Sequence, residues 1–267
     1  MTPVLADKEK KSLHPWRFLF TSLFFLLLPS WAAAERPFLF TESAVPTEKK
    51  VYRLETDFTS NRFSSHDHQT ILDLSLRYGL IQNLELNVEV PYLFQEHNGD
   101  HENQFGDILL KTKIRFIKGR EANPLSVAGQ MFIKVPSSGK DDFFGTTGKP
   151  DIGFIAIASK EFTPVVAHIN FGYVFVGNPS FEDKKDQLRY SLGLEVKLEE
   201  QVFSIVGEIF GNTEIGSTVS SDRLGVLAGV AYRAAEPAIL LDLSAGLGMT
   251  SDSPDYIINA GLTYSFQ

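Results

Sequence analysis

Three things are absent or scarce in this sequence, and each excludes a class of protein. Cysteine is absent, which rules out lipoprotein processing and suits an exported chain that avoids stray disulfides. Beyond residue 34, no segment approaches the ~18 unbroken apolar residues of a transmembrane helix. Basic residues are fewer than acidic ones, 25 against 33, and the resulting formal net charge of −8 makes the chain a poor nucleic-acid binder.

The N-terminus has the pattern of a cleaved export signal. A basic region ending at Arg17 precedes an apolar run at 18–28, and Ala32-Ala33-Ala34 supplies a cleavage site. We predict a signal peptide over 1–34, because the apolar run is shorter than the ~20 residues that a spanning helix needs. Residues 35–50 contain two prolines and mixed charges, and we expect them to form a periplasmic leader.

The clearest pattern in the rest of the chain is a strict alternation of apolar and polar residues. One face of the stretch 84–90 carries Leu84, Leu86, Val88 and Val90, and the other carries Glu85, Asn87 and Glu89. Period two indicates a β-strand with one apolar and one polar face. Because the polar face carries charges and the pattern recurs to the C-terminus, it favours a closed membrane barrel with lipid outside and a wet lumen inside.

The alternation predicts twelve strands, each close to the ~9–11 residues that cross a bilayer at a tilt. They are 51–58, 69–78, 84–94, 106–116, 125–135, 151–161, 166–176, 188–198, 202–212, 223–232, 238–249 and 255–266. Long polar connections (59–68, 95–105, 136–150, 177–187, 213–222) alternate with short ones, except at the last hairpin. Long external loops and short periplasmic turns are the expected asymmetry. The predicted fold is an all-β, transmembrane, antiparallel up-and-down β-barrel of about 12 strands over 51–267.

Aromatic residues support the same topology. On the outward face, Tyr78, Phe116, Tyr232, Tyr264 and Phe266 collect at the periplasmic end, and Tyr92, Phe94, Tyr173, Phe175, Tyr190 and Tyr256 collect at the other. Two girdles suit the two interfaces of a membrane. The last strand resembles the C-terminal signal of outer-membrane barrels, although Gln267 follows the usual terminal Phe. We expect outer-membrane lipids and the barrel assembly machinery as partners.

Three stretches carry a resemblance to a known family. They are Tyr78-Gly-Leu-Ile-Gln-Asn-Leu-Glu-Leu-Asn-Val-Glu-Val-Pro-Tyr92, Phe105-Gly-Asp-Ile-Leu-Leu-Lys-Thr-Lys113, and Gly145-Thr-Thr-Gly-Lys-Pro-Asp-Ile-Gly-Phe154 running on to 159–162. The sequence resembles the outer-membrane transporters named for the meta-cleavage pathway of phenol degradation. The resemblance covers nearly the whole chain after residue 34, implies an outer-membrane barrel, and adds little about the substrate.

The lumen face carries the candidate functional residues. Hairpins centred near Asp100 and Ile81 would align two rows of side chains, Arg77–Glu85–Arg115 and Asp73–Glu89–Lys111, with opposite charges side by side. The predicted lumen and solute-path residues are Asp73, Arg77, Glu85, Glu89, Lys111, Lys113, Arg115, Arg189, Glu195 and Lys197. Such rows are consistent with a salt-bridge network that holds the wall rigid, with a ladder that contacts the solute, or with both.

Other chemistry has weaker support. His66, His68, His97 and His101 lie beside acidic residues in two expected external loops, but their spacing matches no metal motif, and we predict no metal site. A barrel phospholipase needs Ser, His and Asn together on the outside. The nearest combination, His168-Ile-Asn170, points inward and lacks the serine between them. We therefore predict no enzyme activity and no cofactor.

The function predicted from the sequence is a channel in the outer membrane of a Gram-negative bacterium. It would let small molecules, including aromatic or hydrophobic ones, pass passively, because about twelve strands enclose more than a filled eight-stranded barrel and less than a 16-stranded porin. One alternative is a non-conducting barrel with a structural or adhesive role. A lipid-modifying barrel enzyme is a further alternative.

Overall fold

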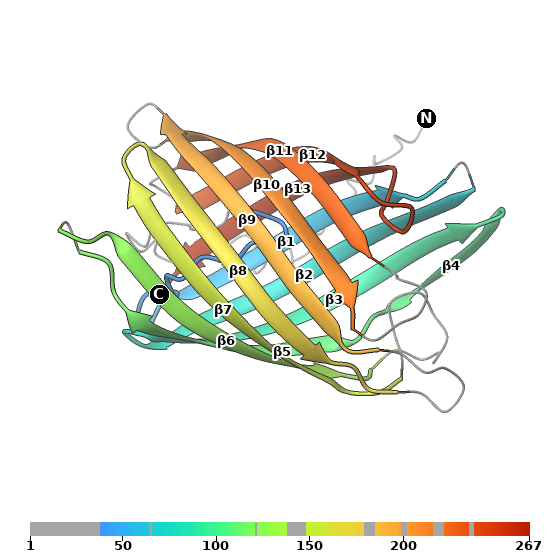
Figure 1. The fold of residues 1–267 in the computed structure, drawn as a ribbon, viewed down its shortest axis with the longest axis horizontal. Coiled ribbons are helices and arrows are strands. Elements are labelled where there is room, and N and C mark those ends of the chain that lie inside the picture. The colour runs from blue at the N-terminus through green and yellow to red at the C-terminus, as the bar shows by residue number, and fades with distance from the viewer. Residues whose placement is uncertain are drawn as a thin grey trace, which may run out of the picture.

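In the computed structural model the chain forms one closed antiparallel barrel of tilted strands (Figure 1). The structure describes residues 38–64, 66–120, 122–137, 148–178, 185–198, 202–215, 222–234 and 238–267. The predicted signal peptide at 1–34 and most of the predicted connections 136–150, 177–187 and 213–222 lie outside these ranges. Within them, no helix is long and apolar enough to cross a membrane.

Strands that follow one another in sequence pair, except that β3 pairs with both β4 and β5, and the pairing of β1 with β13 closes the ring. The strands are β1 (Tyr52–Arg62), β2 (Asp67–Ile81), β3 (Leu84–His97), β4 (Asp100–Phe105), β5 (Ile108–Ile117), β6 (Leu125–Val135), β7 (Asp151–Phe162), β8 (Val165–Phe175), β9 (Gln187–Leu198), β10 (Phe203–Glu214), β11 (Arg223–Ala234), β12 (Ile239–Gly248) and β13 (Tyr256–Phe266). Since β4 and β5 both pair with β3 and follow one another, they are two parts of one wall strand. The predicted barrel of twelve wall strands is confirmed.

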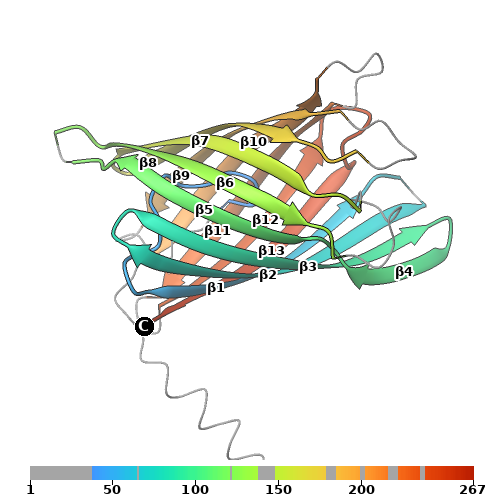
Figure 2. The same ribbon diagram turned by 90° about the horizontal axis from the view of Figure 1, so that it is seen from below.

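The predicted loop at 95–105 is wrong. β3 and β4 pair as a long hairpin that ends in a tight turn at Asn98 and Gly99, both of which have positive φ, and the hairpin projects beyond the neighbouring strands (Figure 2). Side chains on both faces of this hairpin are largely polar and exposed, so the period-two signal is missing although the backbone remains extended. The first predicted loop, 59–68, is also shorter, because β1 and β2 continue to Arg62 and Asp67.

The two faces of the wall differ as the alternation predicts, and β1 illustrates it. Leu54 and Phe58 are 37% and 47% exposed on the outer face, whereas Glu55 and Asp57 are 1% and 3% exposed on the inner face. Outward aromatics stack at the periplasmic end, where the Tyr52 ring lies 4.5 Å from that of Tyr78. An apolar outer band with aromatic edges is the surface that a bilayer requires.

The predicted register of the charged strands is wrong by two residues. Glu85 lies opposite Lys113 rather than Arg115, and Arg77 lies opposite Asn87 rather than Glu85. Asp73 lies opposite Pro91. The hairpins turn at Asn98-Gly99 and Gln82-Asn83 instead of at the centres assumed from the sequence. Because a shift of two keeps every side chain on its face, the predicted orientation toward the lumen survives.

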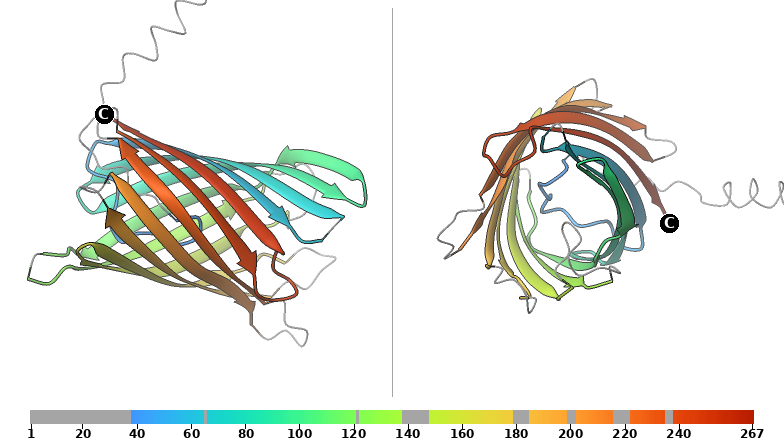
Figure 3. Two further views of the ribbon diagram at one scale, coloured as in Figure 1. Left: turned by 90° about the horizontal axis from the view of Figure 1, so that it is seen from above. Right: turned by 90° about the vertical axis from the view of Figure 1, so that its right-hand side faces the viewer.

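The N-terminal segment before β1 lies inside the barrel. Residues 38–50, which we call the inner segment, run through the lumen and join β1 at the periplasmic end (Figure 3, right). The described part of the predicted periplasmic leader, 35–50, therefore lies inside the barrel and not outside it. Phe38, Ala44 and Val51 have at most 5% of their surface exposed, so the wall encloses them.

Candidate functional site

The inner segment crosses the full diameter of the lumen. Thr47 is bonded to Glu85 on β3, and Thr41 is bonded to Glu208 on β10. In one direction around the ring β5, β6, β7, β8 and β9 separate these two strands, and in the other β2, β1, β13, β12 and β11 do so. With five strands on either side, β3 and β10 are diametrically opposed. The inner segment therefore spans the lumen and is bonded to the wall at both of its ends.

Glu85 anchors the end nearest β1. Its Oε2 accepts hydrogen bonds from the backbone N–H of Thr47 at 2.7 Å and from the Thr47 hydroxyl at 2.8 Å. Its Oε1 lies 3.1 Å from Arg77 Nη1 and 3.6 Å from Lys113 Nζ. Hydrogen bonds to an ionised acceptor are about twice as strong as those between neutral groups. One carboxylate therefore ties the inner segment to two cations of the wall.

Glu208 anchors the opposite end in the same manner. Its carboxylate accepts from the backbone N–H groups of Leu39 and Phe40 and, at 2.6 Å, from the Thr41 hydroxyl. The Phe40 ring stacks on Phe210 with centroids 3.8 Å apart. A carboxylate that receives several backbone donors holds a short peptide much as a helix N-cap does.

The middle of the segment contacts the wall between β6 and β8. The Ala44 N–H donates to Ser159 Oγ at 2.8 Å, and this hydroxyl lies 2.8 Å from His168 Nδ1 on the neighbouring strand. Ala44 also packs against Ala128 and Ile157. The contact between Ser159 and His168 thus takes part in holding the segment.

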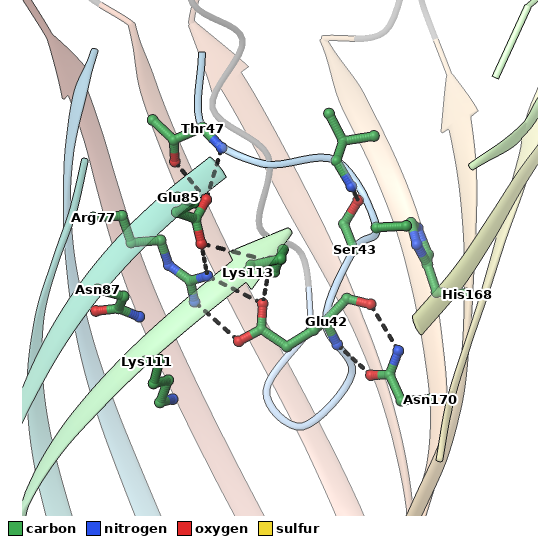
Figure 4. A network of polar contacts seen from close by, with 12 residues as sticks. Glu42, Ser43, Thr47, Arg77, Glu85, Asn87, Lys111, Lys113, His168 and Asn170 are labelled. Atoms are coloured by element: carbon green, nitrogen blue, oxygen red, sulfur yellow. Dashed lines mark hydrogen bonds and ion pairs between the residues drawn. The ribbon is translucent and has the colours of Figure 1, made fainter. Parts of the chain in front are cut away.

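Glu42 makes the densest polar contacts (Figure 4). Its carboxylate receives two bonds from the guanidinium of Arg77, Nη1 to Oε2 at 3.0 Å and Nη2 to Oε1 at 3.2 Å. Lys113 Nζ lies 2.9 Å from Oε2. Asn170 completes the site, since its Oδ1 accepts from the Glu42 N–H at 2.6 Å and its Nδ2 donates to the Glu42 carbonyl at 2.9 Å. Two cations and one amide, from β2, β5 and β8, bind a single residue of the inner segment.

The charges around Glu42 decide its ionisation. Burial alone would raise the pKa of its carboxyl, but the positive charges of Arg77, Lys113 and Lys111 outweigh burial and hold this pKa well below its ordinary value. Glu42 is therefore ionised at neutral pH. Its contact with the wall is an ion pair and not a neutral hydrogen bond.

Comparison with known proteins assigns the family. Residues 41–266 match the family described as "Putative MetA-pathway of phenol degradation". The chain belongs to this family. The matched range begins within the inner segment, one residue before Glu42, so most of that segment lies within the family's extent. The family resemblance noted in the sequence is confirmed.

Solved structures share the fold of this family member at low sequence identity. The COG4313 outer membrane channel from Pseudomonas putida F1 is 10% identical with a TM-score of 0.67, covering 87% of this chain and 100% of that one. The NanC porin is 12% identical with a TM-score of 0.54, over 81% and 99%. The KdgM porin in complex with disordered oligogalacturonate is 9% identical with a TM-score of 0.52, also over 81% and 99%. No curated protein matches the chain in sequence. The fold of this family member is that of outer-membrane β-barrels.

The structure brings together three of the residues that the sequence analysis selected. Arg77, Glu85 and Lys113 form one cluster with the inner segment. Beside it, Lys111 Nζ and Glu89 Oε2 form the expected ion pair at 2.5 Å, by diagonal rather than direct pairing. Whether these residues contact a solute stays a prediction.

The other selected residues lie apart from this cluster. Arg115 bonds Asn83 at the turn between β2 and β3. Arg189 lies over the ring of Phe132. Glu195 accepts a hydrogen bond from Ser204 and forms an ion pair with Arg233. Lys197 forms an ion pair with Glu161. Asp73 faces the lumen on β2, opposite Asp57 and Pro91.

Sequence reasoning missed the residues on the far wall and the segment itself. Glu208, Asn170 and Ser159 become notable only once the inner segment is in place, since each bonds its backbone. A usable signal was the run Phe38-Leu-Phe-Thr-Glu-Ser-Ala-Val, whose apolar content is unusual for a leader exposed to water. The inward orientation expected for His168 and Asn170 is confirmed.

Metal ligands do not gather within the part of the chain that the structure describes, since no group of three or more His, Cys, Asp or Glu residues there is arranged to hold an ion. Among the external histidines, His97 Nδ1 contacts Asp67, and His68 Nε2 lies 2.7 Å from Ser60 Oγ. The first contact joins β3 to β2 and the second joins β2 to β1, at the end of the barrel from which the hairpin projects.

Proposed function

We propose that this protein is an outer-membrane channel for the passive passage of small molecules, and that the inner segment obstructs it in the state described here. The observation that carries the proposal is the inner face of the barrel. Charged and polar side chains line the lumen of a barrel whose outer face is apolar. Such a wall suits a water-filled path through a bilayer.

The inner segment has to move before the channel conducts. It spans the lumen from Glu85 to Glu208 and is held mainly by hydrogen bonds and ion pairs. Because these contacts are polar, a solute that supplies replacement charged or hydrogen-bonding groups can take them over without leaving buried groups unpaired. A segment docked in this way is compatible with a reversible obstruction.

Apolar side chains also face the lumen, interspersed among polar ones, and they bear on the solute. Phe132, Ile157, Val174, Val206 and Leu227 face inward from β6 to β11, and each is buried. The charged cluster lies on β2, β3 and β5. We propose that the solutes combine an apolar, for example aromatic, part with a polar group, because the lumen offers both kinds of side chain.

Two further elements of the proposal concern biogenesis and alternatives. The last strand, β13, ends in the outward aromatics Tyr264 and Phe266, which supports recognition by the barrel assembly machinery.

The segment across the lumen also favours a second candidate function, a barrel that never conducts and serves a structural role. Catalysis is not part of the proposal, since the Ser159–His168 contact is engaged by Ala44.

Solute uptake by proteoliposomes tests the channel function. The purified protein, reconstituted into liposomes, should pass a small aromatic acid or alcohol faster than protein-free liposomes do. It should discriminate against a sugar polymer larger than the lumen. If the barrel is folded in the liposomes but every solute enters at the protein-free rate, the structural role becomes the correct one.

A further inference from the structure

The contacts of Glu42 are those of a bound ligand. Its carboxylate belongs to the inner segment, whereas Arg77, Lys113 and Asn170 belong to three separate wall strands. Both carboxylate oxygens are engaged by the two terminal nitrogens of one guanidinium, the planar two-point geometry by which arginine recognises carboxylates. The wall is therefore built to receive a carboxylate, and the chain supplies one of its own.

The wall keeps this site in shape through two further carboxylates. Arg77 Nε bonds Glu55 at 2.9 Å, and its Nη1 also contacts Glu85 at 3.1 Å. These contacts fix the guanidinium plane and leave its Nη2 directed at Glu42 Oε1. Lys113 is held likewise, between Glu85 and Glu42. Glu55 and Glu85 are positioning residues, and Arg77 Nη2 with Lys113 Nζ are the donors that face the incoming group.

Withdrawal of Glu42 alone would be costly. The side chains of Arg77 and Lys113 are only 7% and 3% exposed, so water has little access to donors that lose their acceptor. An unsatisfied buried donor is penalised more than a made hydrogen bond is rewarded, and more so when it is charged. A carboxylate arriving as Glu42 departs removes this penalty. A neutral amide offers a single acceptor oxygen and no charge, and removes little of it.

We propose that Arg77 and Lys113 form a binding site for the carboxylate of a small organic acid, and that Glu42 occupies this site as an internal substitute for the solute. The proposal rests on the channel function above and names a class of solute for it. Binding of the acid displaces Glu42, which removes the central attachment of the inner segment. The segment then remains held at its ends through Glu85 and Glu208, and in its middle only neutral backbone bonds to Asn170 and Ser159 are left to break before it leaves the wall.

A single introduced cysteine reports this displacement, because the chain contains none. Ala44, which is fully buried, lies two residues from Glu42 and loses its protection when the segment leaves the wall. The experiment measures maleimide labelling of the full-length Ala44→Cys protein in detergent, with sodium propionate, propionamide, or sodium chloride at equal ionic strength. Because a tethered group has an effective concentration in the mM range or above, the probes are used up to about 0.5 M.

Propionate should accelerate labelling at position 44 about fivefold or more over chloride, and propionamide should not. A second protein, Ala44→Cys with Lys113→Met, lacks one of the two cations and should lose the difference between propionate and chloride. Ser251→Cys, on an exposed external turn, is the control and should label at one rate throughout. If Ala44→Cys does not give the compact band of a folded barrel on unheated gels, Ser43→Cys, which exchanges one oxygen for sulfur, replaces it.

Equal labelling in propionate and chloride would overturn the proposal. So would an acceleration by propionate that persists in the Lys113→Met protein, because the acid would then act elsewhere. Labelling requires no transport, so the two hypotheses fail separately. A protein that responds to propionate but passes no solute into liposomes would retain the site and refute the channel.

Discussion

Replacing Gly79 by alanine should expel the inner segment from the wall. A Cβ at this position would lie 1.9 Å from the carbonyl oxygen of Glu48 and 2.6 Å from that of Thr47. Ordinary contact begins near 3.4 Å, so the shortest of these separations has to grow by about 1.5 Å (3.4 − 1.9). The three nearest atoms all belong to the backbone, so no change of rotamer relieves their clash with the new methyl group. Since β1 and β3 hold β2 on both sides, the inner segment is the part that yields.

The magnitude follows from the cost of overpacking. Forcing a methyl group into a filled site costs about 1–3 kcal/mol, which corresponds to about a 5- to 150-fold shift between docked and undocked states. Displacement also breaks the hydrogen bond from Lys50 N to Gly79 O, now 2.7 Å long. Labelling at Ala44→Cys measures the shift, and Gly207→Ala is the matched control because its methyl group meets nothing within 4 Å. Equal labelling rates in the two glycine variants, with both barrels folded, would refute the docked position of the segment.

Three further predictions concern the wall. Glu85→Gln should destabilise the barrel by about 1–3 kcal/mol in urea unfolding. This is less than the about 3–5 kcal/mol typical of a broken buried ion pair, because Arg77 and Lys113 still pair with Glu42. An unchanged unfolding midpoint would contradict this prediction. Leu74→Lys, which places a charge in the middle of β2 on the lipid face, should cost about 2–4 kcal/mol of folding free energy in lipid vesicles. No loss there would mean that this face does not meet lipid. A protease site inserted at Gly99 should be cut on intact cells and one inserted at Arg120 should not, and the reverse result would invert the orientation.

Much of the wall was predictable from the sequence because every strand meets lipid on one face and the lumen on the other. The strand at 125–135 was predicted with its observed ends, and most others within two residues. The alternation fails only where the chain leaves the membrane, as in the hairpin of β3 and β4. Both faces of this hairpin meet water, so its residues are polar on both sides. Its composition is therefore similar to that of a loop, although its backbone is extended.

The contents of the lumen were less predictable, for a different physical reason. Alternation shows that Arg77, Glu85 and Lys113 face inward, but not what occupies the space between opposite walls. Residues that meet inside the barrel, such as Thr41 and Glu208, are far apart in sequence and share no repeat. The register was predicted two residues out because a hairpin centre cannot be located within a polar stretch by pattern alone. The alternation along each strand therefore identified which side chains face the lumen, and only the structure identified which residues they contact.

Planar-bilayer conductance of the intact chain and of a chain lacking residues 38–47 tests the central claim most directly. The deletion removes the contacts to Glu85 and Glu208 and leaves β1 and its neighbours intact. A channel obstructed by its own N-terminal segment should conduct in larger and longer openings once the segment is gone. If both proteins fold and insert, and the deletion conducts no better than the intact chain, the inner segment is not the obstruction. If neither protein conducts, the barrel is not a channel.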